Sequence, residues 1–123
     1  MRAPIPTESQ EQATFFEWLD HQPNKTLRAV TFAIPNGGRR HIATAKRLKA
    51  EGVRPGVPDV MVAMPANAYN GLFLEFKRVK GGVVSLDQRI MHEALIAQGY
   101  QVKVVRGCVE AIAEVGRYLE WGF

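Results

Sequence analysis

The sequence predicts an α/β domain in which a mixed central β-sheet of about four strands is flanked by helices. Segments of helical periodicity alternate with short runs of β-branched and aromatic residues, in the order helix, strand, helix, strand, strand, helix, strand, helix. The strand 72–79 begins almost wholly apolar, which is typical of a strand covered on both faces. The last strand–helix–strand unit would be a right-handed crossover if its strands are parallel neighbours.

In the first half of the chain, two helices and two strands are expected, in alternation, over residues 7–20, 28–34, 39–51 and 59–64. Thr7 is a suitable N-cap for the first helix, and acidic residues in the first turn favour the helix dipole. The strand RAVTFAI ends sharply at the turn 35–38. Gly52 fits the C′ position of the second, basic helix, and Pro65 ends the strand DVMVAM.

In the second half, the expected elements are strand, helix, strand and helix over residues 72–79, 86–98, 100–106 and 109–121. Ser85 or its neighbour caps the first of these helices, and Gly99 follows its end. Ile90, Ala94 and Leu95 are expected to face the core, because they share one side of that helix.

Length and composition indicate one domain, residues 1–123, with residues 1–6 as a flexible arm. A hydrophobic content of 46% is too high for a disordered chain. The single cysteine, Cys108, excludes an intrachain disulfide framework and a cysteine zinc cluster, and is read as structural. Because the chain has no apolar signal core and no apolar run of ~20 residues, it is expected to be a cytoplasmic protein that does not bind membranes.

Positive charge is concentrated in one segment. Residues 39–54 contain six Lys or Arg and one Glu, so their net charge of +5 exceeds the +4 of the whole chain. Such a segment is typical of nucleic-acid binding, although a solvated helix face would look the same. If it binds DNA, the contacts are expected from the loop and helix residues Asn36, Arg39, Arg40, Lys46, Arg47, Lys49 and Arg54.

Two strands are expected to bring a group of charged residues together. Asp59 opens one strand, and Glu75 and Lys77 lie two residues apart on the next, so they share a face while Phe76 points to the other. The turn at 65–71 makes these strands antiparallel neighbours. Two carboxylates form a hard oxygen site suited to Mg²⁺ or Mn²⁺, and a lysine beside them can hold a water or stabilise a phosphate. An exposed strand with alternating charges is the alternative, but apolar neighbours argue against it.

Pro58-Asp59, followed after fifteen residues by Glu75-Phe76-Lys77, resembles the PD-(D/E)XK nuclease signature, and more narrowly the virus-type replication-repair nuclease (VRR-NUC) domain. The motifs that carry this resemblance occur in order along nearly the entire chain. They are Thr7-Glu8 with Gln12, residues 34–38 with Arg40, residues 48–52, 55–59 and 71–77, Leu86-x-Gln88, and Gly99-Tyr100.

The resemblance implies a restriction-endonuclease-like fold and a set of site residues. Asp59, Glu75 and the Phe76 carbonyl would hold Mg²⁺ or Mn²⁺, and Lys77 would be catalytic. Gln88 matches a glutamine of the family's site. Glu8 matches an acid of the first helix, although Glu11, one turn on, could serve instead, and either could simply favour the helix N-terminus.

The activity implied is metal-dependent hydrolysis of DNA phosphodiester bonds. Stand-alone members of the family, from phages and bacteria, resemble Holliday-junction resolvases that act as homodimers, which implies branched DNA as substrate and a second copy as partner. Tyr118, Trp121 and Phe123 are candidates for a dimer interface, with ordinary core packing as the alternative. A catalytically silent DNA-binding module is the rival function, and a protein–protein adaptor would leave the basic segment unexplained.

Three histidines, His21, His41 and His92, are scattered along the sequence. None is spaced from another His or Cys as metal ligands are, so they are interpreted as surface or local hydrogen-bonding groups. His41 lies in the basic helix, where it could contact phosphate.

Overall fold

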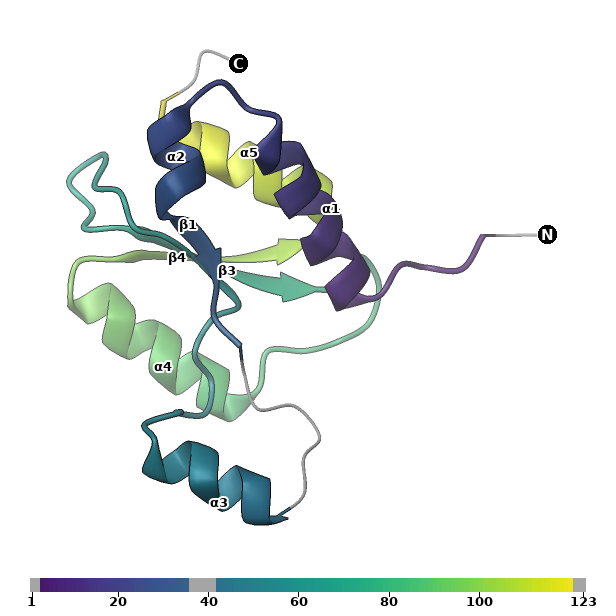
Figure 1. Cartoon of the computed structure of the whole chain (residues 1–123), viewed down its shortest axis with the longest axis vertical. Coiled ribbons are helices and arrows are strands. Elements are labelled where there is room, and N and C mark those ends of the chain that lie inside the picture. Colours follow the sequence, from purple (N-terminus) through teal and green to yellow (C-terminus); the bar gives the residue numbers. More distant parts are fainter. Residues whose placement is uncertain (1–2, 36–41, 121–123) are drawn as a thin grey trace.

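The computed structural model describes residues 3–35 and 42–120, and its central feature is one four-stranded sheet in the order β1-β2-β3-β4 (Figure 1). The strands are β1 (Thr31–Ala33), β2 (Val60–Val62), β3 (Leu72–Lys77) and β4 (Gln101–Arg106). β2 pairs antiparallel with β1 and β3, whereas β3 and β4 are parallel. The predicted mixed sheet is therefore confirmed, including the antiparallel pairing across the turn and the parallel final unit.

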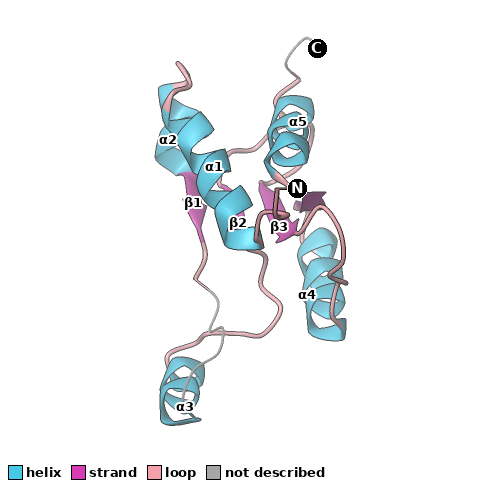
Figure 2. Cartoon of the chain, turned by 90° about the vertical axis from the view of Figure 1, so that its right-hand side faces the viewer, coloured by secondary structure: helices cyan, strands magenta, loops and turns pink. Residues whose placement is uncertain are grey.

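Helices cover both faces of this sheet. They are α1 (Glu8–Asp20), α2 (Lys25–Val30), α3 (Ile42–Ala50), α4 (Leu86–Ala97) and α5 (Cys108–Tyr118). α1 and α5 pack on one face and against each other, and α4 lies on the opposite face (Figure 2). α3 stands apart and has at most marginal contact with the other helices and strands.

All six residues of β3 are buried, as expected for a strand covered on both faces. Leu72, Leu74 and Phe76 face α1 and α5 and belong to the main core, where the rings of Phe76 and Phe15 contact each other with centroids 5.8 Å apart. The alternate residues face α4 and include the charged side chains of Glu75 and Lys77. The chain thus places two ionisable groups in a strand that is otherwise apolar.

Two helix starts match the sequence prediction in detail. Thr7 caps α1 and Ser85 caps α4, each through a capping box in which the residue three positions later bonds back to the cap. The amide of Gln10 donates to Thr7 Oγ1 at 3.1 Å, and the amide of Gln88 donates to Ser85 Oγ at the same distance.

The predicted strand 28–34 is wrong in its first half, which forms the short helix α2. Asn24 caps this helix by accepting a hydrogen bond from the Leu27 amide at 2.9 Å, and Leu27 is fully buried. A local cap and one buried anchor therefore outweigh the β propensity of the segment. Only Thr31–Ala33 are strand.

The predicted inward face of α4 is also wrong. Ile90 is 58% exposed and Ala94 is exposed, while Leu95 is half-buried. The residue that α4 buries is His92. The apolar periodicity was a poor guide to the phase of this helix, because its buried position carries a polar ring.

At the C-terminal end, Tyr118 is buried in the core, where its hydroxyl donates to the Met64 carbonyl at 2.6 Å. Of the two alternatives for Tyr118, a dimer interface or core packing, the structure shows core packing. Trp121 and Phe123 lie outside the described residues. Cys108 is buried with a free thiol. Within the described ranges, no helix has the length and apolar character needed to cross a membrane.

Candidate active site

Asp59 is fixed between two strands at the start of β2. Its amide donates to the Leu74 carbonyl at 3.1 Å, and its carbonyl accepts from the Ile34 amide at 2.7 Å. Its carboxylate oxygen Oδ2 accepts from the Phe76 amide at 2.7 Å. Asp59 is thus held by both main chain and side chain against β3, beside the residue whose carbonyl was predicted as a metal ligand.

Glu75 lies next to Asp59 and is almost completely buried, with 1% of its surface exposed. Burial, followed by the hydrogen bond and the charge of Asp59, raises the pKa of Glu75 to about 9, and Glu8 adds to this rise while Lys77 opposes it. Two carboxyl groups that share so little solvent cannot both carry a charge without a compensating cation. The pair therefore has the electrostatics of a cation site.

Lys77 follows on the same face and is 7% exposed. Among the described residues, no carboxylate oxygen lies within 4.0 Å of its amine, and the two ion pairs found there are formed by His92 and Arg117. Its charge nevertheless lowers the pKa of both Glu75 and His92, so the amine lies near both groups. Lys77 is close to the carboxyl pair without being bound to it.

The two acids of α1 have different surroundings. A Cβ on Gly82 would lie 3.9 Å from Glu8 Oε2 and 3.9 Å from Lys77 Cδ, so Glu8 and Lys77 approach the same spot. Glu11 instead accepts a hydrogen bond from the Cys108 amide at 3.2 Å, at the start of α5. A carboxylate there favours the helix dipole, so Glu11 has a capping role. The acid of α1 that faces the carboxyl pair is Glu8.

The loop after Lys77 is held by Arg106 at the end of β4. The guanidinium donates to the carbonyls of Arg78, Gly81 and Gly82 at 2.9, 2.6 and 3.0 Å. One planar cation therefore fixes the loop that passes between Glu8 and Lys77.

Gln88 lies in the first turn of α4, where its Oε1 accepts from the Ser85 amide at 2.9 Å. This turn is pressed against the loop that leads to Asp59. A Cβ on Gly56 would come within 2.3 Å of the Asp87 carbonyl oxygen and 2.8 Å of the Gln88 amide nitrogen, and Gly56 has φ +82°. Only glycine fits this contact, which joins α4 to the segment before β2.

His92 is a member of the site that sequence reasoning missed. It is buried, not on the surface, and its Nε2 lies 3.2 Å from Glu75 Oε1. Burial and the nearby charge of Lys77 lower its pKa, which favours a neutral ring. A signal was present in the sequence: His92 lies four residues after Gln88, so the two share one face of a helix.

The donor set fits a hard divalent cation. Asp59 and Glu75 supply carboxylate oxygens, and the third ligand would come from Phe76, which directly follows Glu75 and whose amide contacts Asp59. Oxygen ligands of this kind suit Mg²⁺ or Mn²⁺, with water completing the coordination. Within residues 3–35 and 42–120, no three His, Cys, Asp or Glu side chains form a metal-binding group, so a cation here would depend on the carbonyl and water.

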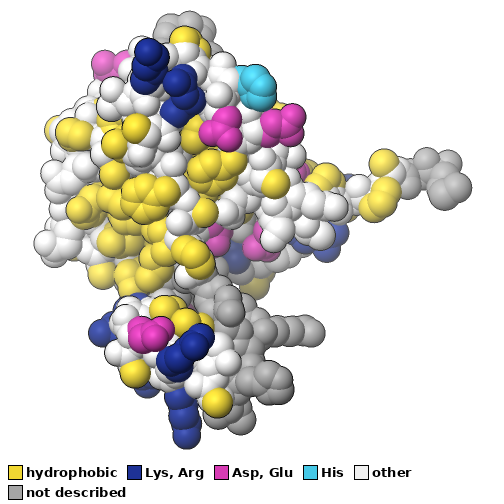
Figure 3. Space-filling model, in the orientation of Figure 1, with side chains coloured by type: hydrophobic (Ala, Val, Ile, Leu, Met, Phe, Trp, Pro, Cys, Tyr) yellow, Lys and Arg dark blue, Asp and Glu magenta, His cyan; other side chains and the backbone are white. Residues whose placement is uncertain are grey.

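The basic residues lie apart from this centre. Lys46, Arg47 and Lys49 on α3 are exposed, as is Arg54 after it. In the space-filling view, Lys and Arg side chains gather on the lobe that α3 forms (Figure 3). The expected apolar stripe of α3 is weak, since Ala45 is exposed and Leu48 only half-buried. Asn36, Arg39, Arg40 and His41 lie outside the described residues.

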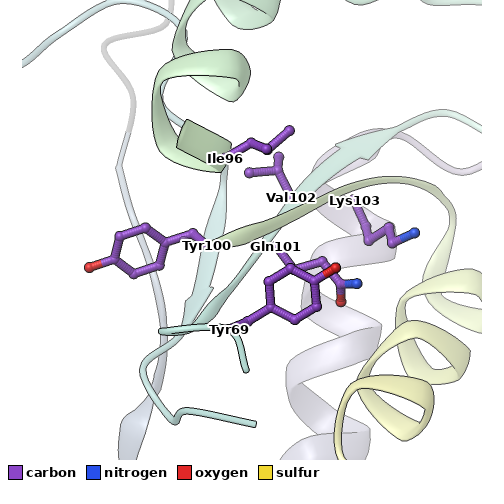
Figure 4. Close-up of a pocket in the computed structure, with 6 residues that line it drawn as sticks. All are labelled: Tyr69, Ile96, Tyr100, Gln101, Val102 and Lys103. Carbon is purple, nitrogen blue, oxygen red and sulfur yellow. The ribbon is translucent and has the colours of Figure 1, made fainter. Parts of the chain in front are cut away.

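A groove of about 180 Å³ lies at the other end of β4 (Figure 4). It is lined by Tyr69, Ile96, Tyr100, Gln101, Val102 and Lys103. In the β3–β4 register, Gln101 pairs with Leu72, whereas Glu75 and Lys77 pair with Val104 and Arg106. This groove is therefore separate from the carboxyl pair.

Comparisons with known proteins agree on one family. Residues 6–108 match the family model described as the VRR-NUC domain. A solved structure described as a VRR_NUC domain protein superposes with a TM-score of 0.83 and 26% sequence identity, covering 97% of this chain and 93% of that one. No curated protein matches the chain.

Proposed function

Because this chain belongs to the VRR-NUC domain family, a family of nucleases, we propose that it is a Mg²⁺- or Mn²⁺-dependent endodeoxyribonuclease, formed by a single domain, that cleaves branched DNA. The observation that carries the proposal is the buried Glu75 beside the half-buried Asp59, with the buried Lys77 close to Glu75. Burying two ionisable groups beside a third is costly unless they act together on a charged partner.

In this proposal, Asp59, Glu75 and the Phe76 carbonyl hold the metal ion, which would supply a Lewis acid for the phosphate and lower the pKa of a bound water. Lys77 orients the attacking water and stabilises negative charge on the scissile phosphate. Its freedom from ion pairs with described acids leaves the amine available for this. Glu8, whose charge acts on Glu75, and Gln88, in the turn of α4 that packs on Gly56, help to orient the metal or the water.

The basic segment holds the DNA backbone. The exposed Lys and Arg side chains of α3, together with Arg54, can contact phosphates without being held in place by other residues. This attraction depends on charge more than on geometry. Phosphate contacts position a protein on DNA without reading its sequence. The proposed contacts are those of Asn36, Arg39, Arg40, Lys46, Arg47, Lys49 and Arg54.

Branched DNA and a homodimer belong together in this proposal. A four-way junction offers two symmetry-related strands, and a twofold dimer would present one site to each. Tyr118 is buried and unsuited to an interface, whereas Leu86 and Ile90 on α4 are 67% and 58% exposed. Sedimentation or light scattering measures the mass directly, and a monomer at micromolar concentration would remove the dimer from the proposal.

The test is cleavage of labelled four-way junction, flap and linear duplex with Mg²⁺ or Mn²⁺, using the wild type, Asp59→Ala and Lys77→Ala. Lys25→Ala, on exposed α2, is the matched surface control. We expect the wild type and the control to cut and the two site variants to lose activity. If all four bind DNA and none cuts, the chain is the catalytically silent module. If junction and duplex are cut equally, the nuclease stands and the junction preference fails.

A further inference from the structure

The polar contact between His92 and Glu75 lies inside the proposed site but has no assigned role. In α4, all of whose residues are described, His92 is the only buried side chain. The helix packs on the sheet through a position that in most helices would carry leucine or isoleucine. Here that position carries an imidazole, whose Nε2 lies 3.2 Å from Glu75 Oε1.

Carboxylate chemistry explains the choice of residue. Glu75 enters a nearly closed space, and an oxygen buried there without a donor would destabilise the fold. Among the described residues, the one buried side-chain atom without a partner is Thr31 Oγ1, so Glu75 is satisfied, and the partner of its Oε1 is His92. A leucine at position 92 would pack on the sheet but would remove this hydrogen-bond partner of Glu75.

α4 is also tied to the other carboxylate. Its first turn packs against Gly56, in the loop that leads directly to Asp59. One helix therefore contacts both strands of the site, β2 through this loop and β3 through His92. The position of the imidazole is set by the same rigid packing that sets Asp59.

We propose that His92 is a positioning residue: its Nε2–H holds Glu75 Oε1 and thereby turns the other carboxylate oxygen, Oε2, toward Asp59 and the metal. The inference rests on the proposed function. The imidazole neither binds the metal nor contacts DNA in this role. Partners that orient a ligand in this way typically contribute 10- to 100-fold to metal affinity.

The experiment measures Mn²⁺ binding by calorimetry or electron paramagnetic resonance, and separately kcat and KM for DNA. The variants are His92→Leu, which fills the space without a donor, and His92→Gln, which restores an N–H. Glu93→Gln, an exposed neighbour on the same helix, is the control. We expect His92→Leu to lose about 10- to 100-fold in Mn²⁺ affinity and in kcat with KM unchanged. His92→Gln should recover much of both, and the control should match the wild type.

Unchanged Mn²⁺ affinity in His92→Leu overturns the inference. If His92→Leu does not fold, His92→Gln is the test variant. A glutamine variant that folds but binds Mn²⁺ no better than Asp59→Ala also overturns the inference. Asp59→Ala distinguishes a failure of the inference on His92 from a failure of the proposed metal site. If it abolishes Mn²⁺ binding while His92→Leu does not, the inference on His92 fails alone. If Asp59→Ala binds Mn²⁺ as well as the wild type, the metal site fails, and both proposals fail with it.

Discussion

The C-terminal end of β3 and the helix α3 are opposite in construction. At β3, the charged side chains of Glu75 and Lys77 are buried, and the neighbouring Asp59 is held by a hydrogen bond from the Phe76 amide to its Oδ2 at 2.7 Å. On α3, no residue with a described side chain is buried, and the helix hardly contacts the other elements. Displacement at phosphorus needs groups placed to within fractions of an ångström, whereas attraction to phosphates acts over about 10 Å and tolerates motion. Of these two regions, the one that bond breaking would require to be rigid is the one with fixed contacts.

The largest difference between β3 and α3 should appear in kcat, when a lysine of each is replaced by arginine and its charge is kept. We expect Lys77→Arg to lower kcat by about 10²- to 10³-fold, because a guanidinium in a 7% exposed position cannot place its charge where the amine was. Lys46→Arg on exposed α3 should have no effect on kcat. Steady-state cleavage rates measure both, and equal rates would show that β3 also acts through charge alone.

A second difference should appear in stability at two glycines with positive φ. Gly56→Ala would place Cβ 2.3 Å from the Asp87 carbonyl oxygen, so we expect a loss of about 2–4 kcal/mol in the free energy of unfolding. Gly52, which follows α3 at φ +99°, has nothing within 4 Å of the added Cβ. Gly52→Ala should cost only the backbone strain, about 1 kcal/mol. Urea unfolding compares them, and similar losses would contradict tight packing at Gly56.

The third prediction concerns salt. Neutralising Lys46, Arg47 and Lys49 to glutamine should weaken DNA binding at physiological salt by about 10- to 100-fold. It should also make the plot of log Kd against log salt shallower by about 2 to 3. At saturating DNA, kcat should not change, because these side chains lie on a separate element. An unaltered salt slope would assign the phosphate contacts to other residues.

The smallest expected effect is on the stability of the metal-free protein, measured in a chelator as the pH is changed. The pKa of Glu75 is about 9 in the folded chain, against 4.5 without the surrounding structure. The folded state then keeps a proton that the unfolded state releases, so stability falls as pH rises from 4.5 to 9. Glu75→Gln does not titrate, so its free energy of unfolding should exceed that of the wild type at pH 8, with no such gain near pH 4. Glu51→Gln, exposed after α3, is the control for thermal unfolding at both pH values.

The sequence was sufficient for the parts of the fold that depend on local patterns. The order of β2, β3 and β4 followed from the turn between β2 and β3 and from the final crossover, and the N-caps of α1 and α4 followed from Thr7 and Ser85. The pairing of Asp59 with the Glu75 strand followed from antiparallel neighbours and period-two facing. These features depend on neighbouring residues, so one sequence is enough to read them.

The errors and omissions concern packing between distant segments. Ile90 was expected in the core, and His92 at the surface or in a local hydrogen bond. The structure exposes Ile90 and buries His92, whose hydrogen-bond partner is a carboxylate 17 residues earlier. Hydrophobic periodicity cannot anticipate a helix whose buried position serves a polar partner. Glu8 and Glu11 were both candidates for the acid of the first helix, and contacts between distant segments separate them: Glu11 accepts from the Cys108 amide, whereas the charge of Glu8 acts on Glu75.

The hydrogen bonds by which Arg106 clamps the loop after Lys77 affect when the site can form during synthesis of the chain. Lys77 belongs to β3, but the loop that follows it is held by a side chain from the end of β4, and β3 itself pairs in parallel with β4. A nascent chain that has left the ribosome only as far as α4 has the carboxyl pair in its sequence but neither that strand nor that clamp. The site is therefore completed only after residue 106 emerges, which would delay DNA cleavage until the domain can fold as a unit.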